Sequence, residues 1–126
     1  MAWVKNEEPA ASRVQALVDK AEAKQLDLIM SMVNVGEVYY LLARLRGHGY
    51  AERFCDDLRT GPVRVVGAPN DLILEAAQWK SRYPISYADA FAAATARRER
   101  AALVSGDPDF KVLSEAGIVE LEWIGG

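Results

Sequence analysis

The sequence has little of several features that would assign it to particular classes of protein. It contains one cysteine, Cys55, so an internal disulfide is excluded and a small core or boundary role is expected for this residue. It contains one histidine, His48, which lies between two glycines and is expected in an exposed turn, so no histidine cluster is available to bind zinc. A glycine-rich phosphate loop and a nucleophile elbow are also absent from the sequence.

Long apolar runs are missing as well, and this bears on where the protein is expected to act. No run of about 18 apolar residues occurs, so no segment is predicted to cross a membrane. Residues 1–9 contain acidic residues and lack the apolar stretch of a signal peptide. With a single cysteine in addition, we expect the protein to be cytoplasmic.

The sequence also lacks an excess of basic residues, since its net charge is −3. A domain that binds nucleic acid through its overall charge would be strongly basic, so any such contact here has to come from local groups. The candidates are Arg44 and Arg46, and a second group of Arg97, Arg98 and Arg100. The alternative is that these arginines complement the dipoles at the ends of helices.

Apolar periodicity and turn residues in the 126-residue chain predict one domain in which helices and strands alternate. Helices are predicted over residues 10–24, 34–46, 50–58, 70–80 and 86–98, with a short one between Asp109 and Gly117. Strands are predicted over residues 26–33, 63–66, 101–104 and 119–123, the last as a half-exposed edge strand. This order predicts an α/β fold of three layers, with helices on both faces of a mostly parallel sheet.

Four acidic residues are predicted to lie near the carboxyl ends of these strands, where ligands collect in open α/β sheets. Glu37 follows the first strand, Asp89 lies in the first turn of an alanine-rich helix, and Asp107 and Asp109 follow the third strand. If the side chains converge, two charges about 4 Å apart repel by roughly 4 kcal/mol at an effective dielectric near 20. A bound Mg²⁺ or Mn²⁺ ion, with its preference for oxygen ligands, would offset this repulsion.

Glu37, Asp89 and Asp107 each also have an alternative interpretation as part of a helix cap. Asn34 and Glu37 have the spacing of a capping box, and Ser86 and Asp89 have the same spacing. Asp107 precedes Pro108, which is typical of a residue that caps a helix. Both interpretations stay open for each position.

Three segments of the sequence resemble successive motifs of the PIN-domain family, the fold of VapC-type toxins. They are NVGEV at 34–38, YADAFAAATA at 87–96 and VSGDPDF at 104–110, and together with the terminal Glu122-Trp123 strand they extend the resemblance over nearly the whole chain. The resemblance implies a ribonuclease that depends on Mg²⁺ or Mn²⁺ and forms the toxin of a type II toxin–antitoxin system. Its partners would be RNA, a cognate antitoxin and a second copy of the chain.

The resemblance also implies roles for individual residues. Glu37, Asp89 and Asp107 would be the catalytic, metal-binding acids, Asp109 would be an additional metal ligand, and Ser105 would support the site through its hydroxyl group.

One departure from the family pattern concerns the start of the chain. The family begins with an apolar strand that ends in an aspartate, and residues 2–9 instead resemble the segment after that strand. Three explanations stay open: a start codon assigned too late, a sheet that closes differently, or a strand from a second chain. The departure keeps a PIN-like module that binds antitoxin or RNA without cleavage as an alternative function. Another alternative is a different α/β hydrolase with Asp107 as nucleophile.

Overall fold

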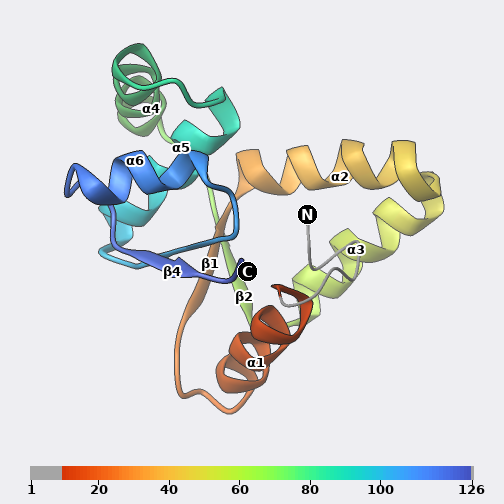
Figure 1. The fold of residues 1–126 in the computed structure, drawn as a ribbon. Helices are drawn as coiled ribbons and strands as arrows, with labels where there is room; N and C mark the ends of the chain where they lie inside the picture. The colour runs from red at the N-terminus through yellow and green to blue at the C-terminus, as the bar shows by residue number, and fades with distance from the viewer. Residues whose placement is uncertain (1–9, 126) are drawn as a thin grey trace.

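The computed structural model describes residues 10–125, and helices and strands alternate along them in the predicted order (Figure 1). The helices in this described part are α1 (Ala10–Glu22), α2 (Met32–Arg46), α3 (His48–Thr60), α4 (Asn70–Arg82), α5 (Tyr87–Glu99) and α6 (Asp109–Glu115). The four strands are β1 (Leu28–Ser31), β2 (Val63–Val66), β3 (Leu103–Ser105) and β4 (Leu121–Trp123). The predicted departure at the start of the chain lies outside the described residues.

The strands are parallel, as predicted, but they form two pairs instead of one sheet. β1 pairs with β2, with Leu28 opposite Val63, and β3 pairs with β4, with Leu103 opposite Leu121. Within residues 10–125 no strand ladder joins the two pairs, so β1 and β3 each have a single strand partner. The predicted α/β fold with parallel strands is therefore confirmed. The prediction of one continuous sheet is corrected to two separate strand pairs.

Helix α5 holds the two strand pairs together. It contacts β1 and β3 and also packs against α2 and α4. Six of its residues are buried, and four of them are alanines, whose short side chains let neighbouring elements approach closely. The helix has buried residues on most of its circumference, which explains why its sequence shows no clear apolar stripe.

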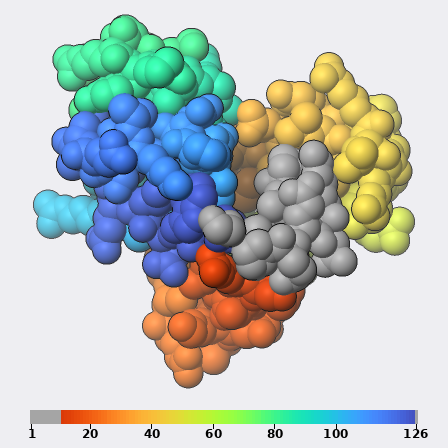
Figure 2. Space-filling view, viewed as in Figure 1, coloured from red at the N-terminus to blue at the C-terminus, as the bar shows by residue number. Residues whose placement is uncertain are grey.

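The helices are divided between two sides of the β1–β2 pair. In Figure 1, α4, α5 and α6 gather on one side, and α2 and α3 form a helical hairpin that extends to the other. In the space-filling view the α2–α3 segment forms a separate yellow lobe opposite the green and blue segments (Figure 2). None of the described helices is long and apolar enough to cross a membrane.

The start of α2 differs from the prediction. Ser31 caps this helix, with its Oγ accepting a hydrogen bond of 3.2 Å from the backbone N–H of Val33. The strand before it ends at Ser31 instead of residue 33, and Asn34 lies inside the first turn of the helix. The predicted capping box of Asn34 and Glu37 is therefore wrong, because the serine nearer the strand caps the helix first.

Two smaller differences concern the α2–α3 hairpin. His48 is exposed as predicted, but it is the first residue of α3 and not part of a longer turn. The turn itself consists of Gly47, whose φ of +92° lies in a region that L-residues other than glycine rarely adopt. Cys55 is half-buried on α3, in agreement with its predicted boundary position.

The predicted cap of α5 is confirmed. The Oγ of Ser86 accepts a hydrogen bond of 3.1 Å from the backbone N–H of Asp89. This hydrogen bond satisfies one of the free N–H groups of the first turn and fixes the backbone from which the Asp89 side chain projects.

We expect the substitution Ser86→Ala to lower the free energy of unfolding by about 1 kcal/mol, because α5 loses its capping hydrogen bond. Urea denaturation followed by circular dichroism measures this change. Ser86→Thr keeps a hydroxyl at the same position and should lose much less. Equal losses in the two variants would show that the hydroxyl does not stabilise the helix.

Candidate metal centre

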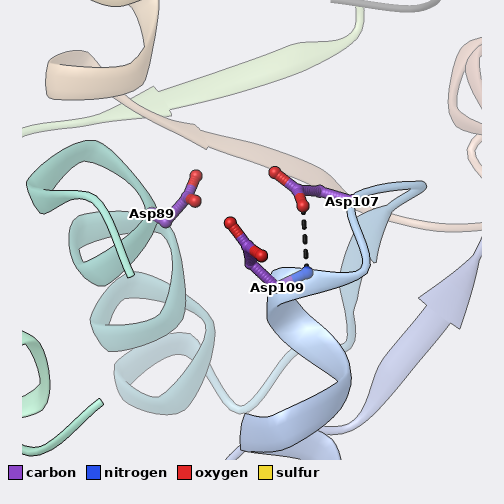
Figure 3. A group of neighbouring side chains, drawn as sticks. All are labelled: Asp89, Asp107 and Asp109. Carbon is purple, nitrogen blue, oxygen red and sulfur yellow. Dashed lines mark hydrogen bonds between the residues drawn. The ribbon is translucent and has the colours of Figure 1, made fainter. Parts of the chain in front are cut away.

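The structure brings three aspartates together beside the β3–β4 pair. Asp89, Asp107 and Asp109 each offer one carboxylate oxygen, and these three oxygens lie within 4.8 Å of one another. Figure 3 shows the three side chains pointing toward a common space, one from α5 and two from the segment where α6 begins. We call these three residues the aspartate cluster.

Local hydrogen bonds determine how the cluster is built. After β3 ends at Ser105, the Oγ of this residue accepts a hydrogen bond of 3.0 Å from the backbone N–H of Asp107. The Oδ1 of Asp107 then accepts a hydrogen bond of 2.9 Å from the backbone N–H of Asp109, drawn as the dashed line in Figure 3. Asp107 therefore takes part in the turn that starts α6 and also contributes to the cluster. Its two interpretations from the sequence, as a helix cap and as a metal ligand, are compatible.

Glu37 lies beside the aspartate cluster but outside the group of three. Its half-buried side chain lines the same hollow as Asp89, a space of about 690 Å³ between the two strand pairs. The charge of Glu37 also acts on Asp89, since it contributes to raising the pKa of that residue. The structure thus places Glu37 near the cluster, at the side of the hollow formed by α2.

Asn34 has a positional role that the sequence did not indicate. Its Nδ2 donates a hydrogen bond of 2.9 Å to the backbone oxygen of Ala88, the residue before Asp89. This bond joins the first turn of α2 to the first turn of α5, and so joins the helix of Glu37 to the helix of Asp89. The contact spans 54 residues, so no local pattern in the sequence could have revealed it.

The surroundings of Asp89 disfavour its charged form. Burial is the main cause that raises its pKa, followed by the negative charge of Asp107, with smaller contributions from Glu37 and Asp109. The hydrogen bond with the Ser86 side chain opposes the shift. A carboxyl group that is half-buried among other carboxylates is stabilised by a proton or by a cation.

The chemistry of the cluster fits a hard divalent cation. All of its ligand atoms are carboxylate oxygens, and none of the ion pairs found within residues 10–125 uses Glu37, Asp89, Asp107 or Asp109. Within the described part of the chain, therefore, no arginine or lysine pairs with this negative charge. Mg²⁺ and Mn²⁺ bind such groups through one or a few carboxylates and several waters.

The raised pKa of Asp89 predicts a pH-dependent stability in the presence of a chelator. The folded chain binds the proton of this carboxyl group more tightly than the unfolded chain does. Its contribution to stability is therefore fully present below the ordinary pKa of about 3.9 and is lost as the pH rises through the raised pKa. The variant Asp89→Asn carries no charge here, so it should melt at the same temperature as the wild type at pH 3 and at a higher temperature at pH 7. A wild type that is the more stable of the two at pH 7 would contradict the electrostatic description.

Two of three comparisons with known proteins agree with this geometry. The family model described as PIN domain matches residues 1–116. Among solved structures, the chain is similar to the VapC20 toxin of Mycobacterium tuberculosis, described as cleaving the sarcin–ricin loop. The TM-score is 0.61 and the sequence identity is 28%, and the match covers 82% of this chain and 81% of that one. No curated protein matches the chain.

The family model covers well over half of the sequence and includes Glu37 and the three residues of the aspartate cluster. The fold is similar to that of the solved toxin structure over most of both chains. The chain belongs to the PIN domain family.

Proposed function

We propose that the chain is a metal-dependent endoribonuclease and the toxin of a type II toxin–antitoxin system. The observation that carries this proposal is the convergence of Asp89, Asp107 and Asp109 within 4.8 Å in a PIN-domain chain. Glu37, Asp89 and Asp107 are proposed as the catalytic acids that bind metal, and Asp109 as a further ligand. Ser105 supports the site by fixing the backbone of the Asp107 loop.

The residues of the chain provide position and charge for this reaction. Ser86 and Asn34 hold the first turn of α5, from which Asp89 reaches the cluster. Asp107 is held by Ser105 on one side and by the N–H of Asp109 on the other. A bound Mg²⁺ or Mn²⁺ would supply the remaining chemistry, by lowering the pKa of a water and by stabilising negative charge on the phosphate.

RNA is the proposed substrate because of the similarity to a toxin that is described as cutting the sarcin–ricin loop. The proposed protein partners are a cognate antitoxin and a second copy of the chain, and the proposed compartment is the cytoplasm. An antitoxin that places an arginine against the aspartate cluster would find unneutralised carboxylates there. The exposed side chain of Leu45 on α2 offers apolar surface for a homodimer.

The experiment that tests the proposal is incubation of the protein with labelled RNA in Mn²⁺, in Mg²⁺ and in excess chelator. We expect fragments to form with either metal and not with the chelator. Heating the protein beforehand provides the control for contaminating nucleases that resist heat. Cleavage that is equal with metal and with chelator, or no cleavage under any condition, would contradict the proposal.

The second candidate is a PIN-like module that binds antitoxin or RNA without cutting. The position of Glu37 outside the group of three favours it, because fewer carboxylates around a cation mean weaker binding. This module would bind RNA in the chelator and leave it intact in Mn²⁺. A hydrolase that uses Asp107 as a nucleophile is less favoured, because no cationic side chain pairs with Asp107 in the described part of the chain.

A further inference from the structure

The α2–α3 hairpin carries a group of arginines that contact tyrosine rings. The guanidinium carbon of Arg44 lies 5.1 Å from the ring centre of Tyr40, and those of Arg46 and Arg53 lie 5.3 Å and 5.9 Å from the ring centre of Tyr50. All five residues are exposed. We call them the Arg–Tyr patch.

The arginines of the patch have no carboxylate partner in the part of the chain that the structure describes. Among residues 10–125, no carboxylate oxygen lies within 4.0 Å of a side-chain nitrogen of Arg44, Arg46 or Arg53. These three arginines lie within ten residues and form a local concentration of positive charge. The chain as a whole has the opposite sign, with a net charge of −3.

The other basic group noticed in the sequence is mostly occupied. Arg98 forms an ion pair of 2.7 Å with Asp71, and Arg97 lies 3.8 Å from Glu75 and donates a hydrogen bond of 2.6 Å to the backbone oxygen of Ile118. These contacts join α5 to α4 and to the segment before β4, so Arg97 and Arg98 connect elements within the fold. The structure therefore separates the two basic groups and leaves the patch as the one available to a partner.

Helix α2 connects the patch to the aspartate cluster. Tyr40 and Arg44 follow Glu37 by three and seven residues, a spacing that places all three on one side of a helix. With a rise of about 1.5 Å per residue, Arg44 lies about 10 Å along the helix from Glu37. Figure 2 shows the yellow lobe that carries the patch on one side of the molecule.

We propose that the Arg–Tyr patch binds single-stranded RNA next to the phosphate that is cleaved at the aspartate cluster. Guanidinium groups without a carboxylate partner are free to bind phosphate oxygens, and exposed tyrosine rings stack on bases of any identity. The choice of RNA as the anion rests on the proposed function, whereas the presence of a polyanion site rests on the contacts of the patch. The patch would position the strand and would not take part in the chemical step.

The patch has a structural alternative, and the test separates the two roles. Arg44 and Arg46 lie in the last turn of α2, where positive charge stabilises the helix dipole, and the pairs Tyr40–Arg44 and Arg46–Tyr50 are four residues apart along the chain. A patch with this role alone would affect the melting temperature and not the affinity for RNA. Both quantities are therefore measured on the same variants.

The experiment measures the binding of a fluorescent single-stranded RNA of mixed sequence by anisotropy, in chelator so that no cleavage occurs. The test variant is Arg44→Gln with Arg46→Gln. The control variant, Arg82→Gln with Arg100→Gln, removes the same charge from two other exposed arginines that have no carboxylate partner among residues 10–125. One of them, Arg82, also contacts a ring, that of Trp79.

We expect the test variant to lower the dependence of log affinity on log salt concentration by about 1.4, because each phosphate contact on a single strand contributes about 0.7. If the affinities of the two proteins converge at about 1 M salt, this change corresponds to about a 25-fold loss of affinity at 0.1 M salt. The control variant should lose less than about threefold. The variant Tyr40→Leu with Tyr50→Leu should lose about tenfold or more, because a stacked base contributes about 1–3 kcal/mol, and 1.4 kcal/mol is tenfold.

Three results would overturn the inference. They are equal losses in the test and control variants, wild-type affinity in the test variant with only a lower melting temperature, and displacement of the RNA by polyglutamate of equal charge at equal concentration. The last result would identify an acidic protein segment as the ligand. Cleavage by the wild type in Mn²⁺ is recorded separately, so an unaffected test variant overturns the patch and leaves the proposed nuclease intact. A wild type that binds RNA through the patch but does not cut it overturns the proposed nuclease and leaves the patch intact.

Discussion

Replacing Asp89 by asparagine is expected to lower Mn²⁺-dependent RNA cleavage by at least about a hundredfold. Asp89 contributes one of the three carboxylate oxygens that lie within 4.8 Å of one another, and the neutral amide removes a charge from the site. A metal ion contributes several kcal/mol of stabilisation to the transition state, and each 1.36 kcal/mol corresponds to a factor of ten in rate. Initial rates on a labelled RNA at equal protein concentration measure the effect.

Asp71 provides a matched control for this substitution. It is also an aspartate in the first turn of a helix, but its pKa is lowered, chiefly by the hydrogen bond from Arg98, and it lies outside the aspartate cluster. The variant Asp71→Asn should cleave RNA within about twofold of the wild-type rate, even if it melts at a slightly lower temperature. Equal rates for the wild type and Asp89→Asn would remove Asp89 from the proposed site.

The largest expected effect on stability belongs to Leu113→Ala. The Leu113 side chain is 0% exposed and lies in the core cluster that also contains Phe110, the residue after Asp109. Removing three buried carbons and leaving a cavity costs about 2–5 kcal/mol in the free energy of unfolding. Because Leu113 belongs to α6, we also expect RNA cleavage to fall at temperatures where the wild type is still fully active.

Leu74→Ala is the matched control, because it is the same substitution at a side chain that is 65% exposed on α4. Its effect should lie within about 0.5 kcal/mol, as for most surface substitutions. Urea denaturation of both variants beside the wild type gives the two values. A smaller loss in Leu113→Ala than in Leu74→Ala would contradict the position of α6 in the core.

Where local signals are strong, the secondary structure could be predicted from the sequence. Strand β2 occurs at residues 63–66, as predicted, because Gly61 and Pro62 precede it and Gly67 follows it. The start of α2 was misplaced because the apolar run continues from β1 into the helix, with two residues able to cap it, Ser31 and Asn34. The division of the strands into two pairs could not be predicted, since pairing is non-local.

The candidate site could likewise be predicted only where its position follows from the order of the elements along the chain. Asp89, Asp107 and Asp109 come together because Asp89 lies at the start of α5 and the other two follow the carboxyl end of β3, where ligands collect in α/β folds. The hydrogen bond from Asn34 to Ala88 and the exact place of Glu37 depend on how α2 and α5 pack. The difference between the two arginine groups likewise depends on Asp71 and Glu75, which precede Arg98 and Arg97 by more than twenty positions.

The most direct measurement is a calorimetric titration of Mn²⁺ into the wild type, Asp89→Asn and Asp71→Asn at pH 7. If the aspartate cluster is a cation site, the wild type and Asp71→Asn should show the same saturable binding, and Asp89→Asn should bind at least about tenfold more weakly. Binding of equal strength in all three proteins, or no binding to the wild type, would show that the cluster does not hold a metal ion.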